Sequence, residues 1–168
     1  MVPETYTFKD DGRIPNSALP ALIYRSVDAV HSAPDCEQLF AGHGWRGAWR
    51  NGIYPFHHFH SISHEVLGIV AGSVTVMLGG PTGRSLDLEQ GDVAVLPAGV
   101  GHCNVGEDGL LVIGAYPNGM RWDLHRGDPD EHDELLSNII RVPVPETDPV
   151  FGEAGPLIEL WGAHGRRS

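Results

Sequence analysis

Between Trp45 and Tyr116 the sequence alternates short β-branched or aliphatic runs with glycine-rich turns, and this pattern constrains the fold more than any other feature. Short strands at a spacing of roughly 8–12 residues are typical of all-β sandwiches and barrels. The pattern therefore predicts an all-β barrel, with a turn at Gly72-Ser73. The expected strands are Val66–Val70, Val74–Leu78, Leu86–Leu88, Val93–Leu96 and Leu110–Tyr116.

Short helices are expected on either side of this region. Ser32-Ala-Pro-Asp35 has the residues of a helix N-terminus, and Gly42 marks a suitable end. A second helix, with an acidic first turn, is expected to begin at Asp128-Pro129. The apolar face of that second helix would consist of Leu135, Leu136, Ile139 and Ile140.

We expect one structural domain in three parts. Residues 1–44 form an N-terminal arm and short helix, and residues 45–120 form the barrel core. Residues 121–168 form a C-terminal helix and an extended tail. Within this tail, the apolar stretch Leu157–Trp161 is expected to pack back on the barrel.

Composition excludes two classes of partner. The formal charge of −11 provides no basic surface for nucleic acid or for an anionic membrane.

The two cysteines, Cys36 and Cys103, form no CxxC motif, so a reducing cytoplasm is the expected location. Met1–Asp10 lacks the apolar segment of a signal peptide, and no apolar run is long enough to span a bilayer.

The segment from Gly52 to Glu65 carries the chemistry. His58 and His60 are two residues apart, so on a strand both side chains project from the same face. A carboxylate on the next strand, beyond the Ser-Ile-Ser connection, can point toward the same place. His102 follows the turn at 97–101 and can supply a further ligand. Imidazoles with one carboxylate suit a divalent transition metal such as Fe, Mn, Ni or Zn.

The carboxylate position has two candidates. On an unbroken strand His64 would share the face of His58 and His60, and Glu65 would point away. A change of phase in the Ser-Ile-Ser segment would instead turn Glu65 inward. The residues alone leave both open; if Glu65 is the ligand, His64 is a residue at the rim of the site.

The spacing of these residues resembles two cupin motifs. The first motif, G-x5-H-x-H-x4-E-x6-G, matches at Gly52, His58, His60, Glu65 and Gly72. The second, G-x5-P-x-G-x2-H-x3-N, matches at Gly91, Pro97, Gly99 and His102 and departs where Gly106 replaces its final Asn. The stretch from about Trp45 to Leu124 is also similar to the uncharacterised bacterial YjlB-type cupins, which supply no reaction.

The resemblance to cupins implies a double-stranded β-helix, or jelly-roll barrel, with the metal near one mouth. It implies that one ion is held by His58, His60, Glu65 and His102, and that the chain forms a homodimer. The remaining histidines, including His57, are expected to face solvent, and Cys103 is expected to pack between the sheets. Candidate pocket walls are Trp45, Trp49, Tyr54, Phe56 and Tyr116, and candidate substrate anchors are Arg46, Arg50 and Arg84.

Three functions fit these features. The first is a metal-dependent enzyme acting on a small organic molecule as a dioxygenase, isomerase or lyase, with His64 or Tyr54 moving protons. The second is a non-catalytic cupin that binds or senses a small molecule. The third is a barrel in which the metal only fastens the strands.

Overall fold

Two long strands, β4 (Glu65–Leu78) and β7 (His102–Pro117), pair antiparallel along most of their length and organise the fold. The other strands extend this pair into one seven-stranded sheet in the order β1-β2-β6-β4-β7-β3, with β5 paired to β4. This computed structural model describes residues 1–165, with side chains to residue 162. The remaining strands are β1 (Glu4–Tyr6), β2 (Ala21–Tyr24), β3 (Trp45–Asn51), β5 (Arg84–Glu89) and β6 (Val93–Leu96).

β4 changes its partner part of the way along. Residues 65–68 pair with β6 and residues 73–78 pair with β5, while β7 pairs with both portions. The change occurs at Gly72, whose φ is +69° and where a Cβ would lie 2.2 Å from the Asp108 carbonyl oxygen. Only glycine fits this position. The turn expected at Gly72-Ser73 is therefore a bend within one strand.

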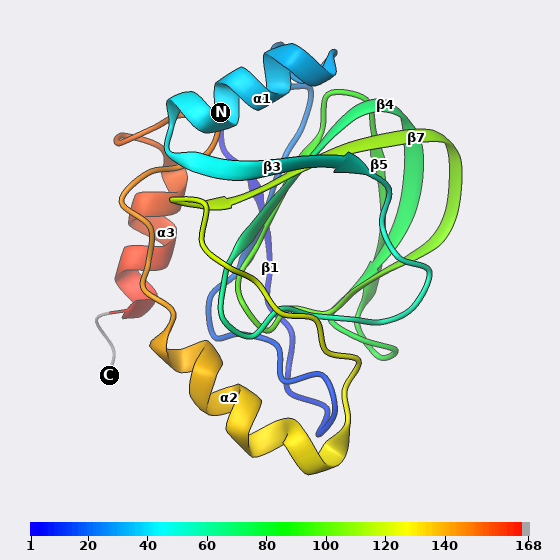
Figure 1. Ribbon diagram of the computed structural model, residues 1–168, viewed down its shortest axis with the longest axis vertical. Helices are drawn as coiled ribbons and strands as arrows, with labels where there is room; N and C mark the ends of the chain where they lie inside the picture. Colours follow the sequence, from blue (N-terminus) through cyan, green and yellow to red (C-terminus); the bar gives the residue numbers. More distant parts are fainter. Residues whose placement is uncertain (166–168) are drawn as a thin grey trace.

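The strands curl around a common interior, and Figure 1 shows the sheet along this curl. All strand pairs are antiparallel, which confirms the expected all-β jelly roll. The hydrogen-bonded path ends at β1 on one side and at β3 on the other, and these two strands do not pair in the described residues. The sheet is therefore curled but is not a closed barrel.

Helix α1 (Ala33–Gly42) packs on the outer face of β4. Its first turn is capped by Ser32, whose hydroxyl accepts a hydrogen bond from the backbone N–H of Asp35 at 3.3 Å. Cys36 and Phe40 are fully buried, and a Cβ on Gly68 would lie 2.6 Å from the Cys36 sulfur. The missing side chain on β4 lets the helix approach the sheet this closely.

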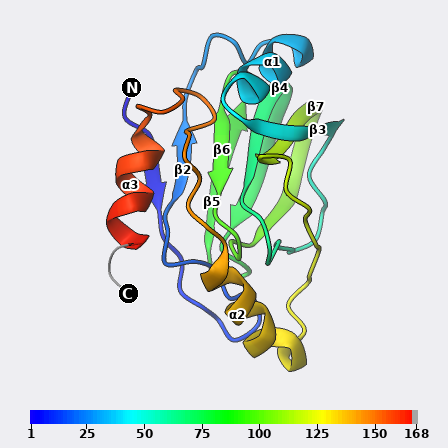
Figure 2. The same ribbon diagram turned by 60° about the vertical axis from the view of Figure 1, so that its left-hand side comes forward.

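Helix α3 (Pro156–Gly165) lies beside β1 and β2 (Figure 2). Leu157 and Trp161 are fully buried, and the indole N–H of Trp161 donates to the Pro20 carbonyl at 2.8 Å. The expectation that this stretch packs back on the sheet is confirmed, although it does so as a helix and not as an extended tail. No helix in residues 1–165 is long and apolar enough to cross a membrane.

A 3-10 turn, η1 (Pro129–Glu131), leads into helix α2 (His132–Arg141). Leu135 and Ile139 are buried, as expected. Ile140 is 76% exposed, so its assignment to the buried face was wrong: it lies one residue beyond Ile139, a rotation of about 100° around the helix.

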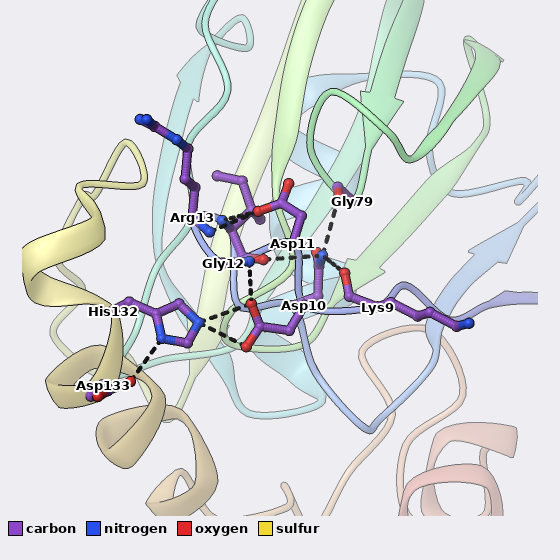
Figure 3. A network of polar contacts seen from close by, with 10 residues as sticks. Lys9, Asp10, Asp11, Gly12, Arg13, Gly79, His132 and Asp133 are labelled. Atoms are coloured by element: carbon purple, nitrogen blue, oxygen red, sulfur yellow. Dashed lines mark hydrogen bonds and ion pairs between the residues drawn. The ribbon is translucent and has the colours of Figure 1, made fainter.

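The start of α2 is joined to the N-terminal segment by the polar network in Figure 3. The His132 Nε2 atom lies 2.8 and 2.7 Å from the two Asp10 carboxylate oxygens, and its Nδ1 atom lies 3.0 Å from Asp133. The Asp10 carboxylate also accepts the backbone N–H of Gly12 at 2.8 Å. One imidazole thus connects two segments more than a hundred residues apart in sequence.

Candidate metal centre

His58 and His102 are held side by side by their own backbones. The N–H of His58 donates to the His102 carbonyl at 3.1 Å, and the N–H of His102 donates to the His58 carbonyl at 2.9 Å. Directly paired residues on antiparallel segments project to the same side. His60 follows two residues later with the same orientation. One ring nitrogen from each of these three buried histidines lies within 4.8 Å of the others.

Each of the three imidazoles is fixed by a backbone carbonyl at its Nδ1 atom. The partner is Phe56 for His58 at 2.9 Å, Val100 for His102 at 3.1 Å, and Asp123 for His60. A carbonyl only accepts hydrogen bonds, so each Nδ1 atom carries the proton. Nε2 is then the atom available to a ligand, which is the tautomer and orientation that metal-binding histidines require.

Glu65, the first residue of β4, brings a carboxylate to the same point. Its Oε2 atom lies 3.2 Å from the His60 Nε2 atom, and its Oε1 atom lies 3.3 Å from the His102 Nε2 atom. The residue is 3% exposed. Three imidazole nitrogens and a carboxylate therefore converge in a buried space, and this donor set suits a divalent transition metal.

His64 points to the opposite side of the strand. Its Nδ1 atom accepts the backbone N–H of Ala98 at 2.9 Å, and its Nε2 atom lies 3.1 Å from the Pro143 carbonyl oxygen. The ring packs on Trp161, with centroids 4.8 Å apart. Both nitrogens are occupied by the backbone, so His64 is neither part of the histidine cluster nor at its rim, contrary to the expectation from the sequence.

The phase change that turns Glu65 inward lies in segment 61–64, which belongs to no strand and begins with Ser61. The backbone N–H of Ser61 donates to the Asp123 carboxylate at 2.6 Å, and its hydroxyl donates to the same group. Because Ser61 is held by a side chain and not by a neighbouring strand, the chain is free to change register before β4 begins.

Burial and neighbouring charges set the protonation of the cluster. Burial, together with the nearby His102, lowers the pKa of His58 to about 3, so this imidazole is neutral at physiological pH. For His60, burial opposes the charge, but the Glu65 carboxylate outweighs it and raises the pKa. Burial opposes the charge on Glu65 as well, but its histidine partners hold its pKa below the usual range. The Glu65 carboxylate is therefore ionised.

The cluster opens into a cavity of about 670 Å³. Of the expected aromatic walls, Trp49, Tyr54 and Tyr116 line it, whereas Trp45 belongs to the core and Phe56 stacks on Tyr54 with centroids 5.0 Å apart. Tyr54 is 49% exposed and lies at the mouth, with its ring centroid 5.4 Å from that of His58. A small organic molecule can therefore reach the histidines past an aromatic rim.

The arginines proposed as anchors do not present a free charge inside the cavity. Arg50 lines the cavity but pairs with Glu37 at 2.6 Å. Arg84 lies over the Tyr6 ring, and Arg46 is exposed on β3.

Two contributors after β7 were not identified from the sequence. Trp122 lines the cavity, and its ring stacks on Tyr116 with centroids 5.9 Å apart. Asp123 orients His60 through its carbonyl and Ser61 through its carboxylate. Neither residue belongs to a spaced motif, so their only signal was their place in the stretch from Trp45 to Leu124 that resembles the YjlB-type cupins.

The other residues singled out in the sequence take structural roles. Cys103 is buried, as expected. His57 is half-buried and does not face solvent fully, and its Nδ1 atom has no hydrogen-bond partner among the described residues. The side-chain oxygen of Asn104 accepts the N–H of Gly106, which stands at the motif position that departs from Asn, at 2.9 Å. His31 is exposed, His43, His125 and His132 are half-buried, and the side chain of His164 lies outside the described residues.

Comparisons with known proteins give a consistent family assignment. The family model described as "Cupin" matches residues 45–119. An uncharacterised protein of Bacillus subtilis (strain 168), YjlB, is 37% identical over 160 residues, which is 94% of this chain and 96% of that protein.

Solved structures similar to this chain are more distant. A DUF861 family protein from Thermotoga maritima is 18% identical, over 57% of this chain and 96% of that chain, with a TM-score of 0.35. An oxalate decarboxylase from Lactobacillus farciminis, in a formate complex, is 20% identical, over 74% of this chain, with a TM-score of 0.40. This chain covers 33% of that decarboxylase.

Proposed function

Because the chain belongs to the cupin family, we propose that it is a metal-dependent enzyme that acts on a small organic molecule. One divalent transition-metal ion, either Fe, Mn, Ni or Zn, would be held by His58, His60, His102 and Glu65. The observation that carries this proposal is the shared orientation of the three imidazoles, whose Nδ1 atoms are all bonded to carbonyls.

The donor set fits such an ion. Three imidazole nitrogens and one carboxylate would complete a tetrahedral zinc site if all four bind, and on an octahedral ion they would leave two positions open. The cavity beside the cluster provides room for a substrate at these positions. When bound, the ion would supply Lewis acidity or redox chemistry of the dioxygenase, isomerase or lyase type.

The chain's own residues would orient the substrate and move its protons. Trp49 and Trp122 provide flat apolar walls that exclude water and hold a small molecule in place. Tyr54 is the candidate proton carrier, because it lies at the mouth beside His58 and its hydroxyl has no partner among the described residues. His64 is not retained in this role, because the backbone occupies both of its ring nitrogens.

A non-catalytic binding or sensing cupin is the alternative. The cavity favours both an enzyme and a binder above the third function, a barrel in which the metal only holds the strands together. A purely structural ion needs no open space beside it. A turnover assay distinguishes the enzyme from the binder, because a binder would release its small molecule chemically unchanged.

The first test is elemental analysis of tag-free protein purified without chelator. About one equivalent of Fe, Mn, Ni or Zn per chain is the expected result. Iron would direct assays to oxygen uptake with small organic acids and thiols, and the other metals to isomerase or lyase assays. Protein that contains no metal and takes none up on reconstitution would contradict the proposal.

The proposal includes a homodimer in the cytoplasm. β1 and β3 each end the hydrogen-bonded path with one open edge, and an open edge is a ready site for pairing with a second copy. The two cysteines are free, which suits a reducing compartment. Light scattering of the purified chain would test the dimer directly.

A further inference from the structure

A chain of hydrogen bonds leads from the cavity wall to the carboxylate of the metal centre. The indole N–H of Trp49, on β3, donates to the Tyr116 hydroxyl oxygen at 2.8 Å. The Tyr116 hydroxyl, on β7, donates to the Glu65 Oε2 atom at 3.0 Å. Three strands thus contribute one residue each, and none of the cupin motif positions in the sequence includes Trp49 or Tyr116.

The direction of this chain is fixed by the chemistry of its first member. An indole nitrogen can only donate, so the Tyr116 oxygen must accept from Trp49. The single hydroxyl proton of Tyr116 is then available to Glu65 alone. A tyrosine hydroxyl is protonated at neutral pH, so Tyr116 keeps that proton. This series of hydrogen bonds therefore directs the Tyr116 hydroxyl proton to one oxygen of Glu65.

The sheet register holds Trp49 in this position. Trp49 pairs with Gly114 on β7, and a Cβ on Gly114 would lie 2.1 Å from the indole ring. The absence of a side chain there allows the indole to lie flat across β7 and to reach Tyr116, two residues further along the strand. On the other side, the Trp122 ring stacks on the Tyr116 ring with an interplanar angle of 18°.

We propose that Trp49 and Tyr116 are positioning residues that fix the Glu65 carboxylate as a one-oxygen metal ligand; this inference rests on the proposed metal centre. Tyr116 donates to Oε2, the oxygen on the His60 side, which would leave Oε1, on the His102 side, to coordinate the ion. Without the hydroxyl, the carboxylate is free to rotate and to bind through both oxygens, and the ion's open positions change in number. Hydrogen-bonded partners of ligating groups typically alter metal affinity by 10–100-fold.

The test is a Co²⁺ titration of the metal-free full-length chain, monitored by competition with a chromogenic chelator and by the visible absorption of bound cobalt. Tyr116→Phe should weaken affinity about 10–100-fold and change the band intensity, because intensity depends on coordination number. Trp49→Phe should shift both readouts in the same direction by less. The double variant should match Tyr116→Phe within about twofold, because the two residues act through one hydrogen bond to Glu65.

Tyr6→Phe is the matched control, because Tyr6 donates to Glu4 at 2.6 Å far from the cavity and should leave both readouts unchanged. A merely structural role for Tyr116 would lower thermal stability without changing the cobalt spectrum. If Tyr116→Phe does not fold, Trp49→Phe carries the same test.

The possible failures are distinguishable. Wild-type affinity and spectrum in both single variants would overturn the positioning role while leaving the metal centre intact. Additive losses in the double variant would also overturn it. Failure of the unaltered chain to bind Co²⁺ would overturn the metal centre and the positioning role together.

Discussion

The His58 and His102 imidazoles lie with their centroids 4.0 Å apart because their backbones exchange two hydrogen bonds. The two residues are separated by forty-three others in the sequence, yet their relative position depends on main-chain geometry and not on side-chain packing. Side-chain substitution at either position therefore removes one imidazole and leaves the other in place.

Replacing His58 or His102 by Ala should abolish stoichiometric metal retention. Removing one of three nitrogens leaves an incomplete donor set, so the metal content after dialysis should fall from about one equivalent to well below half. Elemental analysis of each variant measures this. His31→Ala, which removes an exposed imidazole, is the control and should retain the metal. Full stoichiometry in His58→Ala would exclude His58 as a ligand.

Glu65→Gln and His64→Gln should separate metal binding from stability. Glu65→Gln removes the anionic ligand and should weaken metal binding. His64→Gln removes the buried imidazole that accepts the N–H of Ala98 and packs on Trp161, so it should lower the free energy of unfolding by about 1–3 kcal/mol. Chelator competition and chemical denaturation of both variants provide the two readouts. The reverse pattern would identify His64 as the fourth ligand.

Gly114→Ala should destabilise the chain by about 1–3 kcal/mol, because the new methyl group would overlap the Trp49 indole. Gly106→Ala, on the same strand, is the comparison, because a Cβ there meets no atom within 4 Å. Urea denaturation at one pH measures both. Equal stability of the two variants would show that the indole can move aside without loss.

Stability should depend on the protonation of His132. Asp133 and Asp10 raise the pKa of His132 in the folded chain, so the folded state holds the proton more tightly than the unfolded state. This contribution is fully present below the ordinary histidine pKa and disappears as pH rises through the raised value. Unfolding measured between about pH 6 and pH 8 should show wild-type stability falling relative to His132→Gln as pH increases. A constant difference would mean that the contact contributes no pH dependence.

The all-β class could be predicted from the sequence because β-branched runs and glycine turns are local signals, and the jelly-roll arrangement was implied by the resemblance to cupins. Strand lengths could not: β4 continues through Gly72, which the pattern assigned to a turn, and β7 begins at His102, eight residues before the expected strand at Leu110. At Gly72 the chain bends but stays extended, and its φ of +69° depends on the approach of Asp108 from β7. A contact between distant strands leaves no trace in either strand's own pattern.

The candidate ligands could be identified because His58, His60, Glu65 and His102 occupy fixed spacings. The surrounding residues could not, because Trp49, Tyr116 and Asp123 reach the site only through strand register and through the segment after β7. Likewise, the choice between Glu65 and His64 depended on a phase change in segment 61–64, where Ser61 is held by Asp123 from 62 residues away.

The three imidazoles differ in the origin of their orientation. His58 and His102 each donate from Nδ1 to the carbonyl two residues earlier, so the ring orientation of each is set by its own local backbone. His60 instead depends on Asp123, which belongs to the segment after β7. A lineage that rebuilt or lost that segment would keep two histidines aimed and leave the third free to turn. Evolutionary changes in the segment after β7 could therefore alter the affinity of the proposed site for different metals without changing either motif.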